Sequence, residues 1–393
     1  MDIPASLQDF SLLQGGPFLK LRRRLHLLRP GSPTLRWRLL ALSLLSWLPL
    51  LLLTLLRAEP EGRRAFLLDF HVHIQLLLSL PLLIVAERYV DGRLAVAVRQ
   101  LVSSELVEAR SLRALDDAAR EATRLRSLGF VEVGLLAVSY LLSFTHQFSE
   151  QHPEWIFAGG EGQLSPAGTW YAAVSLPIFR FLVLWWLWRG TVWALFLFRV
   201  SRLPLALRPT HPDLAGGLRF LCTCQGSFAI VTFAVACSSA SATRRLSHVS
   251  PTEDPLKYAL PLLALAFVAL VLVFGPLLSF WLPLVRAKRR GELQFSALAA
   301  LHSRDFERKW FEPQGDQQRP ADTIERRLLG AAEFSSLADL GTAFDVTHRM
   351  RLFPWSRWPI IAVAAAALAP LVPLLIVDRQ FLAVVVQLAQ NLL

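Results

Sequence analysis

Several residue types that mark common protein classes are scarce in this chain. Its 393 residues include three cysteines, all between positions 222 and 237, which is too few for the disulfide framework of a secreted domain. Only four of its 41 basic residues are lysine, and this bias toward arginine is typical of GC-rich bacterial genomes. The sequence also lacks a nucleotide-binding loop, a Ser/His/Asp pattern and a zinc-binding pattern, so it argues against an enzyme and indicates no cofactor.

Charged residues are also few, at 18%, whereas 54% of the residues are hydrophobic and twelve are tryptophan. Together with a mean hydropathy of +0.43, this composition excludes an ordinary soluble domain. Seven apolar stretches approach the ~20 residues that a helix needs to cross a bilayer. They are residues 39–56, 71–87, 129–147, 169–198, 220–240, 258–285 and 359–377. We therefore predict an all-α polytopic membrane protein with about seven transmembrane helices and helical cytoplasmic extensions.

The basic residues are sorted between the segments that connect these stretches. One alternating set of segments carries 32 Lys and Arg, and the other set carries 7. Because cytoplasmic loops are enriched in Lys and Arg, this predicts a bacterial inner-membrane protein with a cytoplasmic N-terminus. The first apolar run follows a basic arm and is too long for a signal-peptide core, so we expect no cleavable signal. Orientation and contact with membrane lipids also explain the net charge of +11, and we predict no nucleic-acid partner.

The predicted spans divide the chain into eight segments. They are a cytoplasmic basic amphipathic arm (1–38), a first transmembrane hairpin (39–87), a cytoplasmic helical hairpin (88–128), a second transmembrane hairpin (129–198), a cytoplasmic turn (199–219), a third transmembrane hairpin (220–285), a cytoplasmic helical region (286–357), and a seventh helix with a short C-terminal apolar helix (358–393). Within the large cytoplasmic region, Ser336 with Asp339 three residues later predicts the N-cap of a helix that ends before Pro354.

The long cytoplasmic helices and the apolar segment 381–393 have no evident packing partner within a single copy of the chain. We therefore predict a homo-oligomer with this segment near the symmetry axis or packed against the bundle. Gln387 and Gln390 are then candidates to line water. At about 13 residues the segment is too short for an ordinary span, so a re-entrant or interfacial helix suits it better.

A Leu-Pro pair recurs near the outer ends of three predicted spans, at residues 80–81, 176–177 and 260–261. Ser79 and Ser175 precede the first two pairs. This recurrence favours three repeated helical hairpins, as some transporters have, although chance competes with it in a chain rich in Leu and Pro.

Arg180 is the most informative single residue. It lies ten residues past Trp170, so a helix places it about 15 Å below the outer interface, near the middle of the membrane. A charge at that depth usually faces a protein interior, a cavity or a partner, and the spans offer no acid at that level. The alternatives are an anion or pore site and a structural arginine bonded to helix carbonyls. Arg189, nine residues later, should point to the opposite face and act as a snorkelling anchor, and we keep it as a second pore candidate.

Other features of the spans provide further candidates. Pro177, and the pair Gly275 and Pro276, should break two of the predicted helices, as happens at transport sites and also in ordinary membrane helices. Asp69, His71 and His73 could hold a metal only if the segment were extended, because in a helix the two histidines point about 200° apart. A metal-dependent site there is the exception to the prediction that the protein is not an enzyme.

Two polar segments resemble sequences from a group of bacterial multi-pass inner-membrane proteins of uncharacterised function. They are RPTHPDLAGGL (208–218) and SLADLGTAFDVTHRMR (336–351). The resemblance implies the membrane class and the bacterial envelope, and it brings no activity, ligand or site residue.

The sequence therefore favours a channel or transporter for a small solute, with an anion preferred because of Arg180 and the scarcity of acids in the spans. The alternative is a non-transporting membrane scaffold or sensor whose cytoplasmic helices bind a partner.

The charge asymmetry predicts which loops face the outside. A cysteine placed at Gly160 should react with a membrane-impermeant thiol reagent in intact cells, and one at Gly315 should react only after lysis, because the loop around Gly315 belongs to the Arg-rich set. The wild-type protein, with its three cysteines in a predicted span, is the background control. The reverse labelling pattern would overturn the orientation.

Overall fold

The computed structural model describes residues 7, 10–11, 34–146, 153–158, 163–249, 256–310 and 332–372. These residues form a predominantly helical chain, which confirms the all-α prediction. The elements are α3 (Thr34–Arg57), α4 (Pro60–Leu68), α5 (Phe70–His73), η1 (Ile74–Ser79), α6 (Leu80–Ser103), η2 (Ala109–Ser111), α7 (Leu112–Arg126), α8 (Gly129–His146), η3 (Glu154–Ile156), β1 (Phe157–Ala158), β2 (Gln163–Leu164), α9 (Pro166–Trp170), η4 (Tyr171–Ser175), α10 (Leu176–Val200), α11 (Arg219–Gln225), η5 (Gly226–Phe228), α12 (Ala229–Val249), α13 (Leu256–Phe274), η6 (Gly275–Phe280), α14 (Trp281–Trp310), α16 (Ala332–His348) and α17 (Arg357–Leu368).

Five of the described helices are long and apolar enough to cross a membrane, and six are if the bent pair α7–α8 counts as one span. The five are 38–57, 70–103, 166–200, 219–243 and 260–310. The seventh predicted span corresponds to α17, which has 12 residues in the described part of the chain and is shorter than a bilayer needs. A fold of five to six long apolar helices is therefore what the structure has, and seven spans stay a prediction.

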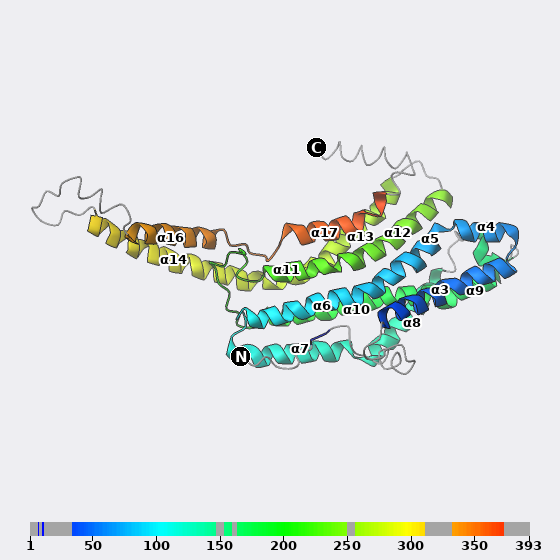
Figure 1. The fold of residues 1–393 in the computed structure, drawn as a ribbon, viewed down its shortest axis with the longest axis horizontal. Coiled ribbons are helices and arrows are strands. Elements are labelled where there is room, and N and C mark those ends of the chain that lie inside the picture. Colours follow the sequence, from blue (N-terminus) through cyan, green and yellow to red (C-terminus); the bar gives the residue numbers. More distant parts are fainter. Residues whose placement is uncertain are drawn as a thin grey trace, which may run out of the picture.

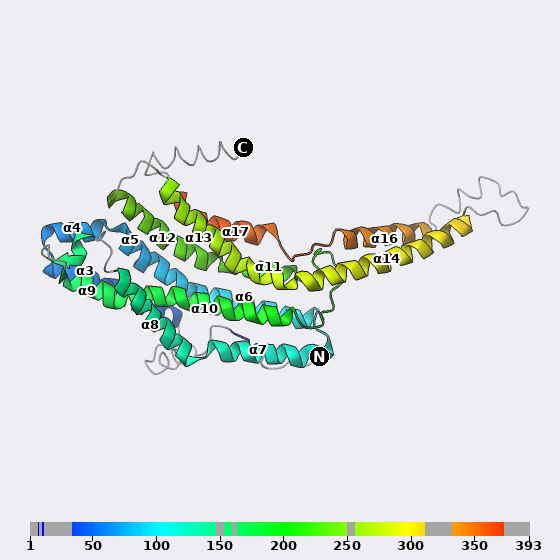
Figure 2. The same ribbon diagram turned by 180° about the vertical axis from the view of Figure 1, so that it is seen from behind.

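Two long helical rods, α5–η1–α6 and α9–η4–α10, run side by side through the molecule (Figures 1 and 2). They span 34 and 35 residues, or about 50 Å each, and so extend well beyond ~30 Å of hydrocarbon. As the sequence predicted, the first rod continues past its apolar part, and α7 then turns back along α10 (Figure 1). The apolar face of α7, which includes Leu115, Ala119 and Ala122, is buried.

Exposed apolar side chains run along three helical segments, and we call them the lipid-facing band because this is the surface expected to meet lipid in a membrane protein. The band runs from Leu40 to Leu56 on α3 and from Phe130 to Phe144 on α8. On the α13–η6–α14 segment it runs from Leu260 to Leu282, about 33 Å of helix, which matches the thickness of the hydrocarbon. On the predicted orientation, Leu40 and Phe130 lie at its cytoplasmic edge.

The helical hairpin of α14 and α16 projects from one end of the bundle, and we call it the arm (Figures 1 and 2). Only Leu284 and Gly291 of α14 are buried, so most of the arm is exposed in the described part of the chain. The predicted helix start at Ser336 is wrong, because α16 already includes Ala332. The helix ends at His348, six residues before Pro354, so this proline is not what terminates it.

Candidate functional site

Each of the two parallel rods contains a π-helical turn directly before its Leu-Pro pair. In η1 the N–H of Leu80 donates to the carbonyl of Gln75, and in η4 the N–H of Leu176 donates to the carbonyl of Tyr171. Both bonds span five residues instead of four. A proline cannot donate to the carbonyl four residues earlier, and a wider turn accommodates its ring. The third pair lies within α13 and has no such turn, so the predicted repeat holds for two hairpins only.

The two π turns meet through polar side chains. The hydroxyl of Tyr171 donates to Gln75 Oε1 over 2.9 Å, and both side chains are buried. These residues occupy equivalent places, each five positions before the leucine of its pair. The hydroxyl of Tyr140 on α8 donates to the carbonyl of Ala173 over 3.1 Å, which Pro177 leaves without its helical donor. Helix breaks at π turns are frequent at functional sites, and here they place polar groups inside the bundle.

Arg180 lies on α10, nine residues or about 14 Å beyond Tyr171, and its side chain is half-buried. Its Nη1 atom is buried and has no hydrogen-bond partner in the described part of the chain. Tyr171 is the titratable group that interacts with it electrostatically, and no carboxylate forms an ion pair with it among the described residues. The guanidinium therefore has a spare donor on α10 in the described part of the chain.

Arg189 does not snorkel, and this prediction is wrong. Its side chain is only 2% exposed, and its guanidinium lies over the ring of Trp185 at 4.5 Å. A snorkelling arginine extends along the lipid face to water, whereas this one turns into the packed interior. Its charge interacts with Glu87, Asp91 and Glu132, and also with the like charge of Arg126.

These groups form a buried cluster of charges, which we call the charge cluster. Arg38 Nη2 lies 2.6 Å from Glu87 Oε2, with both side chains nearly enclosed. Ser11 donates to Asp91 Oδ2 over 2.5 Å, so a described part of the N-terminal region also reaches the cluster. The cluster has three cations and three acids and draws on five helices: Arg38 (α3), Glu87 and Asp91 (α6), Arg126 (α7), Glu132 (α8) and Arg189 (α10). Its balanced charge is what allows so many ionised groups to stay together in the bundle.

The sequence alone did not reveal this cluster, because Glu87 and Glu132 lie far from the level of Arg180 and come from different helices. Asp91 and Arg126 were also not predicted as partners of Arg189. A signal was available, because Glu87 and Asp91 are four residues apart and therefore share one face of a helix. An acidic pair on one face of an apolar helix needs cations from neighbouring helices.

The three residues proposed for a metal are bound to three different partners. Asp69 accepts a hydrogen bond from Trp155, His71 Nδ1 lies 3.0 Å from Ser241 Oγ, and His73 Nδ1 accepts from Trp47. No group of three His, Cys, Asp or Glu with metal-binding geometry occurs in the described ranges. The geometry therefore gives no support to the metal-dependent exception.

The remaining candidates fall into two groups. At the predicted helix breaks the backbone departs from α-helical bonding without a break in the helix: Pro177 follows the π turn η4, and Gly275 and Pro276 open the 3-10 turn η6. Gln387 and Gln390 lie outside the described residues.

A second candidate region joins the arm to the bundle, and we call it the junction. The loop after α10 turns sharply, with positive φ at Leu214, Gly216 and Gly217. Asp213 holds this turn, because its carboxylate accepts hydrogen bonds from the N–H groups of Ala215 and Gly217 at 2.8 and 3.0 Å. Such a turn is a fixed structural element rather than a loose connection.

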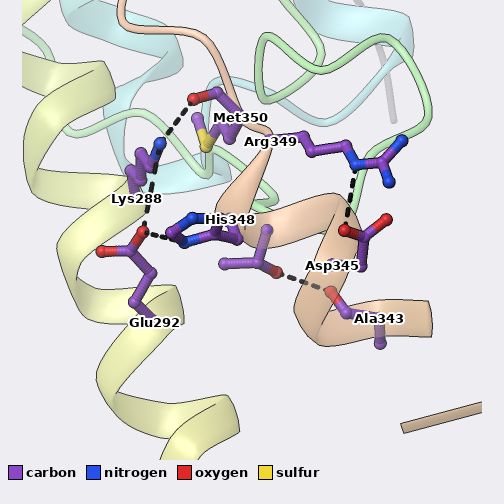
Figure 3. A network of polar contacts seen from close by, with 8 residues as sticks. Lys288, Glu292, Ala343, Asp345, His348, Arg349 and Met350 are labelled. Atoms are coloured by element: carbon purple, nitrogen blue, oxygen red, sulfur yellow. Dashed lines mark hydrogen bonds and ion pairs between the residues drawn. The ribbon is translucent and has the colours of Figure 1, made fainter. Parts of the chain in front are cut away.

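The end of α16 packs on this turn. The N–H of Arg351 donates to the carbonyl of Leu214 over 2.8 Å, and Lys288 Nζ on α14 donates to the carbonyl of Met350 over 3.0 Å. Glu292 lies 3.3 Å from His348 Nδ1, so α14 and α16 are also linked directly (Figure 3). The two segments that carry the resemblance stated above, 208–218 and 336–351, therefore meet at one place in the fold.

Comparisons with known proteins identify no relative. No family model matches the chain, and neither a curated protein nor a solved structure does. The resemblance to uncharacterised bacterial membrane proteins therefore stays a prediction.

The equal numbers of cations and acids in the charge cluster predict how single and double variants of the Arg38–Glu87 pair differ in stability. Glu87→Gln should lower the stability by about 3–5 kcal/mol, because it leaves Arg38 without its carboxylate and gives the cluster an excess positive charge. The double variant Arg38→Gln with Glu87→Gln restores the balance and should recover most of the loss. Thermal unfolding in one detergent, with Glu108→Gln from an exposed ion pair as control, measures this. Equal losses in the double and single variants would contradict it.

The packing at the junction predicts that alanine substitution of two glycines has opposite effects on stability. A Cβ atom on Gly291 would lie 2.7 Å from two atoms of Pro209 and 2.9 Å from Thr347 Cγ2. Gly291→Ala should therefore destabilise the protein by about 1–3 kcal/mol through overpacking. Gly341→Ala on α16 meets no atom within 4 Å and should be neutral or stabilising. Both are read from the unfolding temperature and from proteolysis of the arm, and equal behaviour of the two variants would refute the packing argument.

Proposed function

We propose that the protein is a channel or transporter for a small solute, with a preference for an anion. The path follows α10, from Arg180 in the middle of the membrane to the charge cluster around Arg189. Ionised side chains within membrane helices are costly, face the bundle interior and mark ion or substrate pathways. This chain has such groups at two levels of one helix.

The observation that carries the proposal is the state of Arg180. Its guanidinium has a buried Nη1 donor without a hydrogen-bond partner in the described part of the chain, and no described carboxylate pairs with it. An anion would supply both the missing acceptor and the missing negative charge. A cation at this level would be repelled, so Arg180 sets the sign of the solute.

The charge cluster has a different part in this proposal. It lies nine residues, or about 14 Å, further along α10 toward the cytoplasm on the predicted orientation. Its three cations and three acids balance, so it does not itself select a sign. Instead it closes the inner end of the path, because a solute can pass only if ion pairs such as Arg38–Glu87 separate. An entering anion can take the place of the carboxylate beside an arginine, which lowers the cost of that separation.

In this proposal the π turns are the points at which the two rods can bend. The rods are least regular at η1 and η4, directly above Arg180, where the backbone departs from the α-helical bonding pattern. Tyr171 and Gln75 link the two turns, so a change at one of them is passed to the other. Broken helices next to a charged site are a common arrangement in transporters.

Arg180→Gln tests the proposal. The variant should fold and should reduce anion flux into proteoliposomes roughly tenfold or more, since a hydrogen bond to a charged group contributes about 1.5–3 kcal/mol. Chloride and larger anions are measured under an imposed gradient and voltage. Arg202→Gln, an exposed arginine two residues past the end of α10, is the matched control and should keep wild-type flux.

Two outcomes would count against transport. Wild-type protein that passes none of the anions would refute it, and so would an Arg180→Gln variant with unchanged flux and lower thermal stability. The second outcome would assign Arg180 a structural role.

A scaffold or sensor is the second candidate, and the arm favours it. Leu293, Leu298 and Leu301 on α14 are 74%, 51% and 59% exposed, an unusual cost for a helix in water. The junction fixes the base of the arm to the bundle. A cytoplasmic partner that covered these leucines would be held at a defined distance from the membrane. Absence of flux together with intact folding would leave this candidate in place.

A further inference from the structure

The helices α7 and α8 meet at an elbow (Figures 1 and 2), where they bend by 44°. A groove lies at this elbow. It has a volume of about 520 Å³. Seven residues line it: Asp117, Arg120, Glu121, Arg124, Leu125, Leu128 and Phe130. Neither the path through the bundle nor the arm uses this groove.

One end of the groove opens onto the lipid-facing band. Phe130 is 74% exposed and begins the row of apolar side chains on α8 that continues through Val133 and Leu141. The other end lies along α7, a highly charged helix that the predicted orientation places in the cytoplasm. The groove therefore sits where lipid headgroups meet the cytoplasm, and its occupant has one apolar and one polar end.

Two of the four charged lining residues are already neutralised. The Glu121 carboxylate accepts hydrogen bonds from both terminal nitrogens of Arg199. Arg120 forms an ion pair with Asp116 at 2.7 Å. Arg124 and Asp117 remain, and neither forms an ion pair with any residue that the structure describes. The groove thus offers one available cation and one available anion.

The order of these groups along the helix is informative. Starting from the lipid end, the apolar residues Leu128 and Leu125 come first, then Arg124, and then Asp117 about 10 Å further along the axis. Both charged residues face the same side, because seven residues make almost two full turns of helix. A ligand that follows the groove meets an apolar surface, a positive charge and a negative charge in that order.

We propose that the groove binds a phospholipid whose headgroup ends in a primary ammonium, as in phosphatidylethanolamine. Its acyl chain lies on Phe130 and Leu128, its phosphate binds Arg124, and its ammonium binds Asp117. A purely anionic lipid would place its headgroup beside the Asp117 carboxylate, which repels it. A choline headgroup has no N–H to donate, so it satisfies the carboxylate less well than an ammonium does.

The surrounding contacts keep this groove in shape. The bond between Glu121 and Arg199 ties α7 to the end of α10, and the buried face of α7 packs beneath it. A lipid bound here would touch both the cytoplasmic helix and the membrane helix at the elbow. It would be a fixed part of the protein surface, unlike the lipids along the rest of the band.

Lipid retention measured by native mass spectrometry tests the proposal. The full-length protein is extracted from vesicles with equal parts of phosphatidylethanolamine, phosphatidylglycerol and phosphatidylcholine. The wild type should retain phosphatidylethanolamine several-fold over the other two. Soluble glycerophosphoethanolamine in excess should not displace it, because this headgroup lacks the acyl chain; displacement would show a site for the headgroup alone and overturn the lipid assignment.

Two variants and one control separate the two charges. Asp117→Asn should remove the preference for the ethanolamine lipid and shift retention toward phosphatidylglycerol. Arg124→Gln should reduce retention of both. Arg304→Gln, an exposed arginine on the arm, should behave as wild type. An unchanged lipid ratio in Asp117→Asn, or equal retention of choline and ethanolamine lipids by the wild type, would overturn the proposal.

Discussion

A guanidinium buried among apolar helices must be balanced by carboxylates from other helices, and the packing of this bundle around Arg189 depends on that requirement. Arg189 is 2% exposed, and the acids that balance it come from α6 and α8. Two of these acids attract further cations, Arg38 from α3 and Arg126 from α7. Because each charge needs partners on other elements, no one of these helices can move away alone. The apolar contacts between the rods have no comparable directionality.

The other polar centre, the junction, works by shape instead of charge. Its turn depends on positive φ angles and on an aspartate that caps the chain, and Gly291 lets Pro209 approach closely. The arm is therefore a rigid continuation of the bundle, and the angle at which it leaves is determined by the loop between α10 and α11. A movement of the arm would therefore be passed to the bundle through α14, which belongs to both.

The parts that the sequence predicted well are those that one helix determines by itself. Apolar length located the rods, Pro177 and Pro276 located the departures from α-helical bonding, and the position of Arg180 without an acid at its level followed from spacing. The errors concern relations between helices. Arg189 was expected to snorkel because a buried arginine needs acids such as Asp91 and Glu132 beside it. Their positions next to Arg189 depend on how the helices pack, which the sequence alone does not show. The start of α16 was misplaced because a local capping pattern cannot compete with contacts to α14.

The π turns also have a bearing on how this fold can change. A π turn accommodates one extra residue by widening a single turn of an α-helix, so the residues beyond it keep the facing that they would have without the extra residue. Arg180 and Arg189 lie beyond η4, and Glu87 and Asp91 lie beyond η1. Both rods contain such a turn at the same level, and their charged faces meet. A residue gained or lost at η1 or η4 can therefore be absorbed by the turn, whereas the same change elsewhere in one rod would rotate its charges by about 100° away from the other rod.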